Sequence, residues 1–594
     1  MQRVKALLEP KMELQGQSRT LKRKIITYLC IFSYACSFCS IFYHFYSPKS
    51  LNSSISELFH CQTFEKATGA SHETLNYIIS DTEYVNETIV KLQNIVRIPT
   101  EIADNHPDPG SNKDAEMYKP FYTLHEQLEA DFPLIWSKLQ VEKVNELALL
   151  ITWKGSDESL KPLLFASHLD VVPVERQTWD EWKHPPFSAD IEYDPEDYLK
   201  STVWGRGSFD DKNMLIGELQ AVELLLSKGF EPKRGIIIAV GSDEEASGFF
   251  GAQKINEVLL ERYGEGGIYA IVDEGLNGIQ VKEGVHIASP GTGEKGFINF
   301  WIHLTTPGGH SSVPPDHTSI GIVSGLLKKI ESQKFPVLFT EKNPVSQWYQ
   351  CVAQYSPDMD NELRFDFLNA MNDEESNAHV ISYLLETGGK KVEYLLRTSQ
   401  AIDIIDGGFK ANALPETVSV LINSRVALES TVNETMAKFI NQIKETCAEY
   451  DLGLEYNGLE IIEKTEYGSF SVEIDVGRDP IPSSPNNDVW KHFAGSIKSF
   501  YEDVVFPARF ENPPNELVIA PTIMSGNTDC MNYLSLTDNI YRFQPGFISP
   551  DTIGTIHSVN EHVDFETVMN SVAFVYHYIC LLYTSPSPRD TERS

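Results

Sequence analysis

The chain has 594 residues, of which 41% are hydrophobic and 22% are charged, and this length predicts two or more domains. The formal net charge is −35, and so acidic a protein is not expected to bind nucleic acid, because phosphate neutralisation requires lysine and arginine. Three of the eight cysteines lie within residues 26–46, and the other five are scattered with no CxxC spacing, which argues against a thiolate zinc site and a dense disulfide scaffold, although one or two disulfides stay open.

The N-terminal region differs from the rest of the chain. A basic tail occupies residues 1–25, and residues 26–46 contain no Asp, Glu, Lys or Arg. This run is about as long as a membrane-spanning helix, and the positive charge before it predicts a cytosolic N-terminus. We expect a signal anchor with the body in a lumen, and a cleaved signal peptide is the alternative. Three sequons, at Asn52, Asn86 and Asn433, agree with a lumenal body.

A first α/β pattern follows a polar segment at 47–75 that is typical of a stalk. A helix is expected near 81–97. Strands are expected over 147–153, 162–166, 235–240 and 268–272, and a helix over 213–228. The apolar residues of that helix lie on one face, namely Leu215, Leu219, Val222 and Leu226. Such alternation predicts an α/β sheet with helices on its faces.

A second body interrupts this pattern from about residue 293. Strands are expected over 297–304 and 418–426, and helices near 321–333 and 434–450. After about residue 480 the first pattern returns and ends in a helix at 564–582. We therefore predict a discontinuous domain (76–292 and 479–582) with an inserted domain (293–478) and a disordered tail (583–594).

Histidine and acidic residues follow the predicted strands. Ligands of open α/β sheets bind beyond the carboxyl ends of strands. Each group has a simpler explanation when taken alone, such as a structural histidine, a helix N-cap or a solvated acidic loop. The residues are His168 and Asp170, Asp210 and Asp211, Glu244 and Glu245, Asp273 and Glu274, and, far downstream, His557.

Taken together, these residues are suited to a two-metal site. One histidine with two or three carboxylates is a donor set that zinc accepts in an open catalytic site. A shared carboxylate can bridge two metals about 3.5–4 Å apart. Three carboxylates (Asp210, Glu245 and Asp273) against two Zn²⁺ leave one positive charge, which a bridging hydroxide would cancel.

The chain closely resembles the M20 family of co-catalytic zinc metallopeptidases, and within it the carboxypeptidase S (Gly-X carboxypeptidase) group. The motifs that carry this resemblance occur in family order over roughly residues 80–580: SHLDVVPV, WGRGSFDDK, GSDEEASG, VDEG, GGHSSVPP, NALPE with SRV, GNTD and IHSVNEHV. The N-terminal tail and span are similar to those of vacuolar, type II anchored members. The resemblance implies an α/β fold: a catalytic domain with a mixed sheet flanked by helices, and an inserted α/β sandwich lid and dimerisation domain.

The resemblance also implies roles for individual residues. Two zinc ions per chain would be held by His168, Asp210, Glu245, Asp273 and His557, with Asp210 as the bridge. Related families place a ligand at either acidic position of the Asp-Glu-Gly segment, so Glu274 is the alternative to Asp273. Glu244 would be the general base and Asp170 would orient His168. A cis peptide between Asp210 and Asp211 is implied as well.

Substrate contacts are implied mainly in the lid. His310 would reach the substrate carbonyl, often in a partner subunit, while Asn412 and Arg425 would contact the tetrahedral intermediate and the terminal carboxylate. Gly526 and Thr528 match the substrate loop, although the family more often has a second glycine at position 527. The segment between about 336 and 400 has no counterpart that assigns it a role.

These residues predict a zinc carboxypeptidase that releases the C-terminal residue of a peptide by activating water. The alternative is an N-acyl-amino-acid hydrolase or synthase with the same site. An inactive scaffold or receptor ectodomain is disfavoured, because the expected ligands and base are all present.

Overall fold

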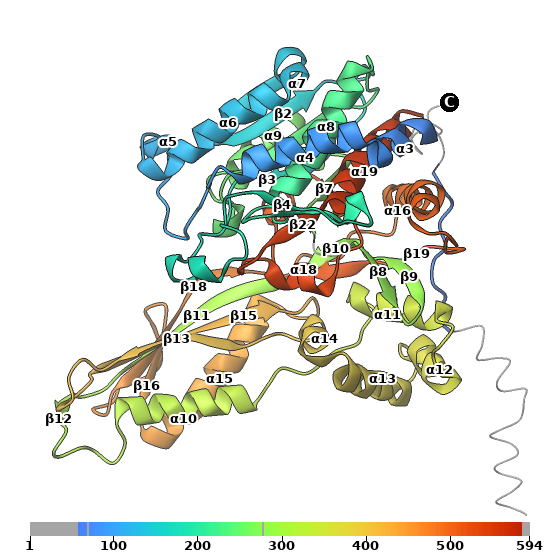
Figure 1. The fold of residues 1–594 in the computed structure, drawn as a ribbon. Helices are drawn as coiled ribbons and strands as arrows, with labels where there is room; N and C mark the ends of the chain where they lie inside the picture. Colours follow the sequence, from blue (N-terminus) through green and yellow to red (C-terminus); the bar gives the residue numbers. More distant parts are fainter. Residues whose placement is uncertain (1–57, 68–70, 276–277, 585–594) are drawn as a thin grey trace, which may run out of the picture. The chain divides into compact units, whose positions relative to one another are not determined.

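The computed structural model describes residues 58–67, 71–275 and 278–584, shown in Figure 1. The described residues from His60 onward form one unit. The predicted basic tail, the span at 26–46, residues 47–57 and 68–70 of the predicted stalk, and the tail from 585 lie outside the described residues.

An eight-stranded mixed sheet forms the centre of the first domain. Its strands, in spatial order, are β1 (Gln140–Val144), β2 (Ala148–Trp153), β6 (Ile236–Gly241), β3 (Leu163–His168), β7 (Ala270–Asp273), β21 (Ile540–Arg542), β10 (Gly291–Glu294) and β20 (Thr522–Met524). β3 pairs in parallel with both β6 and β7, so the three strands end at one edge. That edge carries His168 and Asp273 as last residues of their strands.

Helices cover both faces of this sheet (Figure 1). The residues of β6 are all buried and alternate between two cores: Ile236 and Ile238 pack in one, Ile237 and Ala239 in the other. The first core also contains residues from α3 (His72–Ser80), α4 (Thr82–Val96), α6 (Lys119–Asp131), α7 (Pro133–Lys138), α8 (Lys212–Ser227), α16 (Asp488–Phe500) and α19 (Phe565–Thr584). The second contains residues from α9 (Ala252–Tyr263). Burial on both faces explains why these strands are continuous hydrophobic runs.

Shorter elements complete the first domain. They are α5 (Pro109–Asn112), β4 (Asp190–Glu192), β5 (Thr202–Trp204), β8 (Ile279–Lys282), β9 (Val285–Ala288), α17 (Phe506–Arg509), β19 (Val518–Ile519), α18 (Pro550–Thr555) and β22 (His562–Asp564). Within the described part of the chain, α19 alone is long and apolar enough to span a membrane, but 83% of its apolar window is buried in the protein. Its place between α8 and α3 is that of a core helix.

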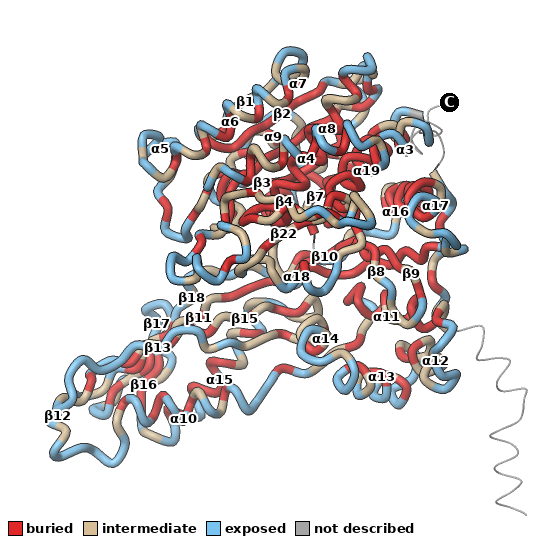
Figure 2. Tube along the Cα trace, in the orientation of Figure 1, coloured by how far each residue is buried: buried red, intermediate tan, exposed pale blue. Residues whose placement is uncertain are grey.

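A second sheet, with six strands, forms the inserted domain. Its strands, in spatial order, are β13 (Ala401–Gly407), β15 (Thr417–Val426), β11 (Gly296–Thr305), β18 (Ser469–Arg478), β16 (Gly453–Tyr456) and β17 (Leu459–Ile462). Two helices, α10 (Ser319–Ser332) and α15 (Val432–Tyr450), pack on one face. The result is a two-layer α/β sandwich, as the resemblance implied. Figure 2 shows its edge strand β13 as largely exposed.

The segment between about 336 and 400 folds into four helices with their own apolar core. They are α11 (Pro344–Tyr355), α12 (Asn361–Asn369), α13 (Glu374–Thr387) and α14 (Gly389–Leu395). A disulfide joins Cys351 of α11 to Cys61. Cys61 and Phe64 are buried, and α3 begins at His72. The prediction of a stalk over 47–75 is therefore wrong for residues 60–67 and 72–75, because a disulfide that the sequence could not pair anchors this polar segment.

The predicted strands and helices are otherwise confirmed, with ends within about two residues of the expected positions. The amphipathic pattern over 213–228 corresponds to α8, and all four of its predicted core residues are buried.

Candidate metal centre

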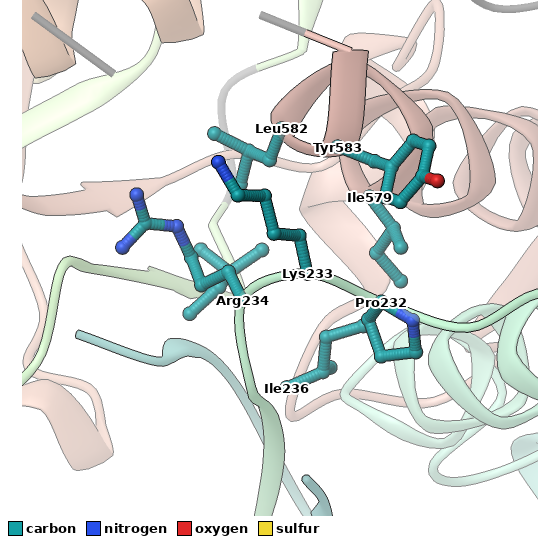
Figure 3. A pocket seen from close by; sticks show the side chains of 8 residues that line it. Pro232, Lys233, Arg234, Ile236, Ile579, Leu582 and Tyr583 are labelled. Carbon is teal, nitrogen blue, oxygen red and sulfur yellow. The ribbon is translucent and has the colours of Figure 1, made fainter. Parts of the chain in front are cut away.

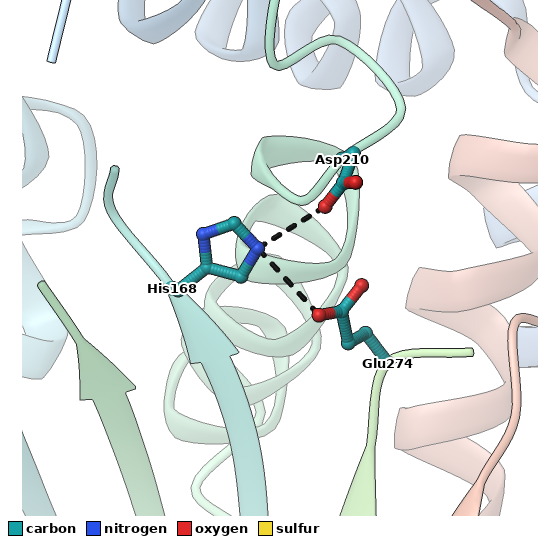
Figure 4. Close-up of side chains that lie close together, drawn as sticks. All are labelled: His168, Asp210 and Glu274. Carbon is teal, nitrogen blue, oxygen red and sulfur yellow. Dashed lines mark hydrogen bonds and ion pairs between the residues drawn. The ribbon is translucent and has the colours of Figure 1, made fainter. Parts of the chain in front are cut away.

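Two histidines face the same carboxylate. His168 ends β3 and is 1% exposed, and its Nε2 lies 3.2 Å from Asp210 Oδ1 (Figure 4). His557 comes from the loop after α18, and its Nε2 lies 3.0 Å from Asp210 Oδ2. Each oxygen of Asp210 thus points to a different histidine. This is the geometry that a carboxylate needs to bridge two metal ions.

Two glutamates complete these groups. Glu274 Oε1 lies 3.6 Å from His168 Nε2, and Glu245 Oε2 lies 3.1 Å from His557 Nε2. The ligand atoms of His168, Asp210 and Glu274 lie within 4.8 Å of one another, as do those of Asp210, Glu245 and His557. Each set has one histidine and two carboxylates, and Asp210 belongs to both sets. Both sets suit zinc.

Asp273 is turned away from this centre. Its Oδ1 accepts the N–H of Glu274 at 2.9 Å, and its Oδ2 accepts the N–H of Cys530 at 3.0 Å. In a strand, successive side chains point to opposite faces, so two adjacent acids at the end of β7 cannot both face His168. The arrangement favours Glu274 over Asp273 beside the first metal position.

Asp170 supports three of these residues. The Nδ1 atom of His168 lies 3.0 Å from the Asp170 carbonyl oxygen and 3.4 Å from its Oδ1. The Asp170 carboxylate also accepts the N–H groups of Glu244 and Glu245, both at 3.1 Å. One buried aspartate therefore orients the first histidine and the turn that carries the adjacent glutamates.

The acids at this centre repel one another. Burial, and next the charge of Glu274, raise the pKa of Glu244. Burial and the charge of Asp210 likewise raise the pKa of Glu274 and of Glu245. Hydrogen bonds to Asp210 and Glu245 raise the pKa of His557 to about 10. So many buried carboxylates require protons or cations to neutralise them, which fits a metal-binding role.

The loop that presents Asp210 is held by a residue for which the sequence assigned no role. Glu561 is fully buried, and its Oε1 accepts the N–H groups of Gly207, Phe209 and Asp210 at 2.8, 3.2 and 3.2 Å. Its Oε2 accepts Arg206 Nη1 at 2.7 Å. The peptide between Asp210 and Asp211 is cis, as the resemblance implied. The sequence signal for Glu561 was its place in the motif IHSVNEHV, four residues after His557.

Close packing beneath the glutamates explains one motif glycine. A Cβ on Gly241 would lie 1.9 Å from Asp529 Oδ2, so no larger residue fits there. Asp529 ends the GNTD motif and is buried, and burial raises its pKa. The strand end that precedes Glu244 is thereby packed closely against the loop that carries Asp529.

The inserted domain brings one predicted residue to this loop. Arg425, near the end of β15, donates from Nη1 to Asn527 Oδ1 at 2.6 Å. Burial lowers the pKa of the Arg425 guanidinium, and the charges of Glu294 and Glu244 oppose this shift. A Cβ on Gly526 would meet open space, whereas Thr528 is buried and its hydroxyl donates to Glu294 at 2.9 Å. Gly526 thus lies on the open side of the loop, and the Thr528 hydroxyl does not.

Two predicted lid residues lie elsewhere. His310 is in the two-residue strand β12 (Gly309–His310), which pairs with β14 (Ala413–Leu414), and both His310 and Asn412 are exposed. Among the described residues, the hydrogen bonds found for the His310 ring join its Nδ1 to the hydroxyl and the N–H of Ser312. Figure 1 places β12 at the far end of the second sheet, away from β3 and β7. His310 therefore does not reach the metal centre of its own chain.

A separate hollow opens at the opposite edge of the first sheet. It lies between residues 232–236 and the end of α19 and has a volume of about 10 Å³ (Figure 3). Room for about one water molecule does not make a substrate site.

Sequence comparison gives a matching protein family and related proteins. Residues 164–580 match Peptidase family M20/M25/M40. The chain is 42% identical over 521 residues to "Carboxypeptidase S" of Saccharomyces cerevisiae, covering 87% of this chain and 88% of that protein. It is 31% identical to "N-fatty-acyl-amino acid synthase/hydrolase PM20D1" of Bos taurus, covering 76% and 81%.

Solved structures share the fold. The di-peptidase Dug1p of Saccharomyces cerevisiae aligns with a TM-score of 0.57 at 15% identity, over 88% of this chain and all of that one. Human carnosine dipeptidase 1 aligns with a TM-score of 0.55 at 14% identity, over 87% of this chain and all of that one. The family match spans most of the chain and includes every residue of the metal centre, so the chain belongs to peptidase family M20/M25/M40.

Proposed function

We propose that this protein is a two-zinc carboxypeptidase that releases the C-terminal residue of peptides. The observation that carries the proposal is the bridging position of Asp210, whose two oxygens lie 3.2 and 3.0 Å from His168 and His557. The similarity to a carboxypeptidase S over most of both chains supports the substrate class.

Zinc would be held by His168, Asp210 and Glu274 at one position and by Asp210, Glu245 and His557 at the other. When bound, the pair of ions supplies an activated water and polarises the scissile carbonyl. Glu244 would take the proton of that water and pass it to the leaving amine. Arg425 would bind the terminal carboxylate through parallel N–H groups, which selects substrates with a free C-terminus.

A second candidate uses the same residues on another substrate. The similarity to the N-fatty-acyl-amino acid synthase/hydrolase favours it, and its substrate would carry the same carboxylate for Arg425 to bind. Incubating the purified full chain with peptides and with fatty-acyl amino acids, with and without zinc, separates the two. We expect peptides to be cleaved faster and chelation to abolish cleavage. Preference for acyl amino acids would favour the second candidate.

The lid supports assembly as a homodimer. Its edge strand β13 is exposed, with Ile404 and Ile405 at 46% and 56% exposure, and Phe409 beyond it is 88% exposed. An exposed apolar edge strand is a template for pairing with another chain. His310 does not reach the metal centre of its own chain. In a dimer that pairs along β13, each chain could instead bring its His310 and Asn412 to the metal centre of the other chain.

We further propose a single-pass type II membrane protein with a lumenal body in a vacuole-like or lysosome-like compartment. The basic tail before residues 26–46 supports this topology. The disulfide between Cys61 and Cys351 supports an oxidising compartment, and the sequon asparagines Asn86 and Asn433 are exposed. Glycosidase digestion of the full-length protein tests this proposal, and increased gel mobility is expected. Protease protection in sealed vesicles is a second test, and protease access to the body from the cytosolic side would contradict the proposal.

A further inference from the structure

A chain of polar contacts connects the first sheet to Arg425 in the lid. Glu294, the last residue of β10, is fully buried, and its Oε1 accepts Arg542 Nε at 2.6 Å and Thr528 Oγ1 at 2.9 Å. Its Oε2 accepts Asn527 Nδ2 at 3.4 Å. Asn527 then meets Arg425 through its other amide atom.

These contacts determine which end of the Asn527 amide faces Arg425. Asn527 Nδ2 has two acceptors, Glu294 Oε2 at 3.4 Å and the Lys295 carbonyl oxygen at 3.1 Å. The amide nitrogen only donates, so the oxygen lies on the opposite side and accepts Arg425 Nη1 at 2.6 Å. If the amide were turned over, its nitrogen would face the guanidinium donors and its oxygen would face the Glu294 carboxylate. Both contacts would be repulsive.

Arg425 keeps most of its donors for a ligand. The guanidinium of Arg425 has five N–H groups in a planar fork. Among the described residues, the hydrogen bond found for these groups is the one to Asn527. Its backbone is fixed, because its N–H donates to Ser399 Oγ at 2.7 Å and its carbonyl accepts the Ser399 N–H at 3.0 Å. A guanidinium held at one nitrogen is pre-organised to bind a carboxylate through the others.

A neutral amide is the suitable group for this contact. An aspartate at position 527 would form a charge-assisted pair with Arg425 and would compete with a substrate carboxylate. An amide oxygen holds the guanidinium without adding a negative charge at position 527 that would compete with the substrate carboxylate.

We propose that Asn527 sets the selectivity for a free substrate carboxylate by holding Arg425, and that Glu294 is a positioning residue that orients the Asn527 amide. This inference rests on the proposed function, in which Arg425 binds that carboxylate. It applies equally to peptides and to N-acyl amino acids, because both carry the group.

The test compares KM and kcat for one peptide as its free acid and as its C-terminal amide, using the full chain loaded with zinc. If peptides are not turned over, an N-acyl amino acid and its amide take their place. Asn527→Ala should raise KM for the acid about 10-fold, because the guanidinium loses the hydrogen bond that holds it in place. Its kcat should change less than about twofold, because binding is lost uniformly. Asn527→Asp should raise KM further.

Coupling to Arg425 separates the proposal from general damage. Arg425→Ala should lose the preference for the acid, and adding Asn527→Ala to it should have no further effect. Glu294→Gln should raise KM for the acid in the same way, and Asn527→Ala carries the test if that buried change prevents folding. Asn423→Ala is the control. Asn423 lies in β15, as Arg425 does, and its side chain donates a hydrogen bond to Asn299 Oδ1 at 2.8 Å. Removing this bond should leave KM unchanged.

The proposal would be overturned by a fall in kcat with unchanged KM in Asn527→Ala, by effects of Asn527→Ala and Arg425→Ala that multiply, or by an equal loss in Asn423→Ala. If Arg425→Ala itself leaves the preference for the acid intact, the carboxylate-binding step of the proposed function fails instead. A loss in Arg425→Ala without one in Asn527→Ala rejects only the role of Asn527 and Glu294.

Discussion

The carboxylate of Glu561 accepts the backbone N–H of Asp210 at 3.2 Å, so the residue that faces both histidines is held by a second, fully buried acid. The same oxygen also accepts two neighbouring N–H groups, and the other oxygen pairs with Arg206. The position of the Asp210 carboxylate therefore depends on a residue that belongs to neither of the two candidate ligand sets.

Replacing Glu561 should weaken metal binding. Glu561→Ala removes the acceptor for three N–H groups, and loss of such support typically costs about 10–100-fold in metal affinity. Glu561→Gln keeps an acceptor oxygen but places an N–H donor opposite Arg206, so this variant should lose less zinc affinity than Glu561→Ala. Competition with a chelator measures zinc affinity. Glu566→Gln, which changes another glutamate paired with an arginine (Arg509), is the control and should bind zinc normally. Normal affinity in Glu561→Ala would contradict this role.

The adjacent glutamates should have separable roles. Glu244→Gln should keep its zinc and lose about 10²–10⁴-fold in turnover, because only proton transfer is removed. Glu245→Gln should lose zinc, because Glu245 Oε2 lies 3.1 Å from His557 Nε2. Elemental analysis and turnover of both variants test this, and each variant serves as the control for the other. Exchanged phenotypes would show that the two assignments are reversed.

The third carboxylate should be Glu274. Glu274→Gln is expected to lower zinc content, because Glu274 Oε1 faces His168 Nε2 at 3.6 Å. Asp273→Asn should keep zinc but lower the melting temperature, because Asp273 accepts two backbone N–H groups in the interior. Loss of zinc in Asp273→Asn with normal zinc in Glu274→Gln would restore Asp273 as the ligand.

The sequence predicted the fold and most of this centre for a physical reason. Strands such as β6 are buried on both faces, so their apolar runs are unmistakable, and the polar residues after them mark one edge of the sheet. The choice between Asp273 and Glu274 could not be made, because it depends on which way a single strand end points. The pairing of Cys61 with Cys351 and the contact of Asn527 with Arg425 join segments far apart in the chain, and periodicity carries no signal for such contacts.

Zinc should stabilise the protein more at high pH than at low pH. Without metal, hydrogen bonds to Asp210 and Glu245 raise the pKa of His557 to about 10, so its proton stabilises the fold below its ordinary pKa of 6.5, and this contribution is lost as pH rises towards 10. The raised pKa values of Glu244 and Glu274 act in the same direction, because their ionised forms repel. Zinc replaces these protons and neutralises the acids.

The measurement is the difference in melting temperature between zinc-loaded and metal-free protein from pH 6 to 9. This difference should increase with pH, and calorimetry in two buffers should show proton release on zinc binding at pH 7. Taking the difference cancels the contributions of titrating groups that zinc binding does not affect. A difference that falls with pH, or zinc binding without proton release, would contradict the assignment of these residues to the metal centre.

The last prediction concerns the exposed position of His310. It lies in β12 at the far end of the lid, beside Asn412, whose carbonyl accepts the N–H of Ser311 at 3.3 Å. If a partner chain receives this histidine, His310→Ala and Glu244→Gln should each be inactive alone but should complement each other. Random pairing makes about half of the dimers hybrid, each with one complete site, so co-expression should restore about one quarter of wild-type activity. Mixing His310→Ala with a chain that carries both changes is the control and should restore none. If tagged hybrid dimers form without recovery, His310 does not act in the partner's site.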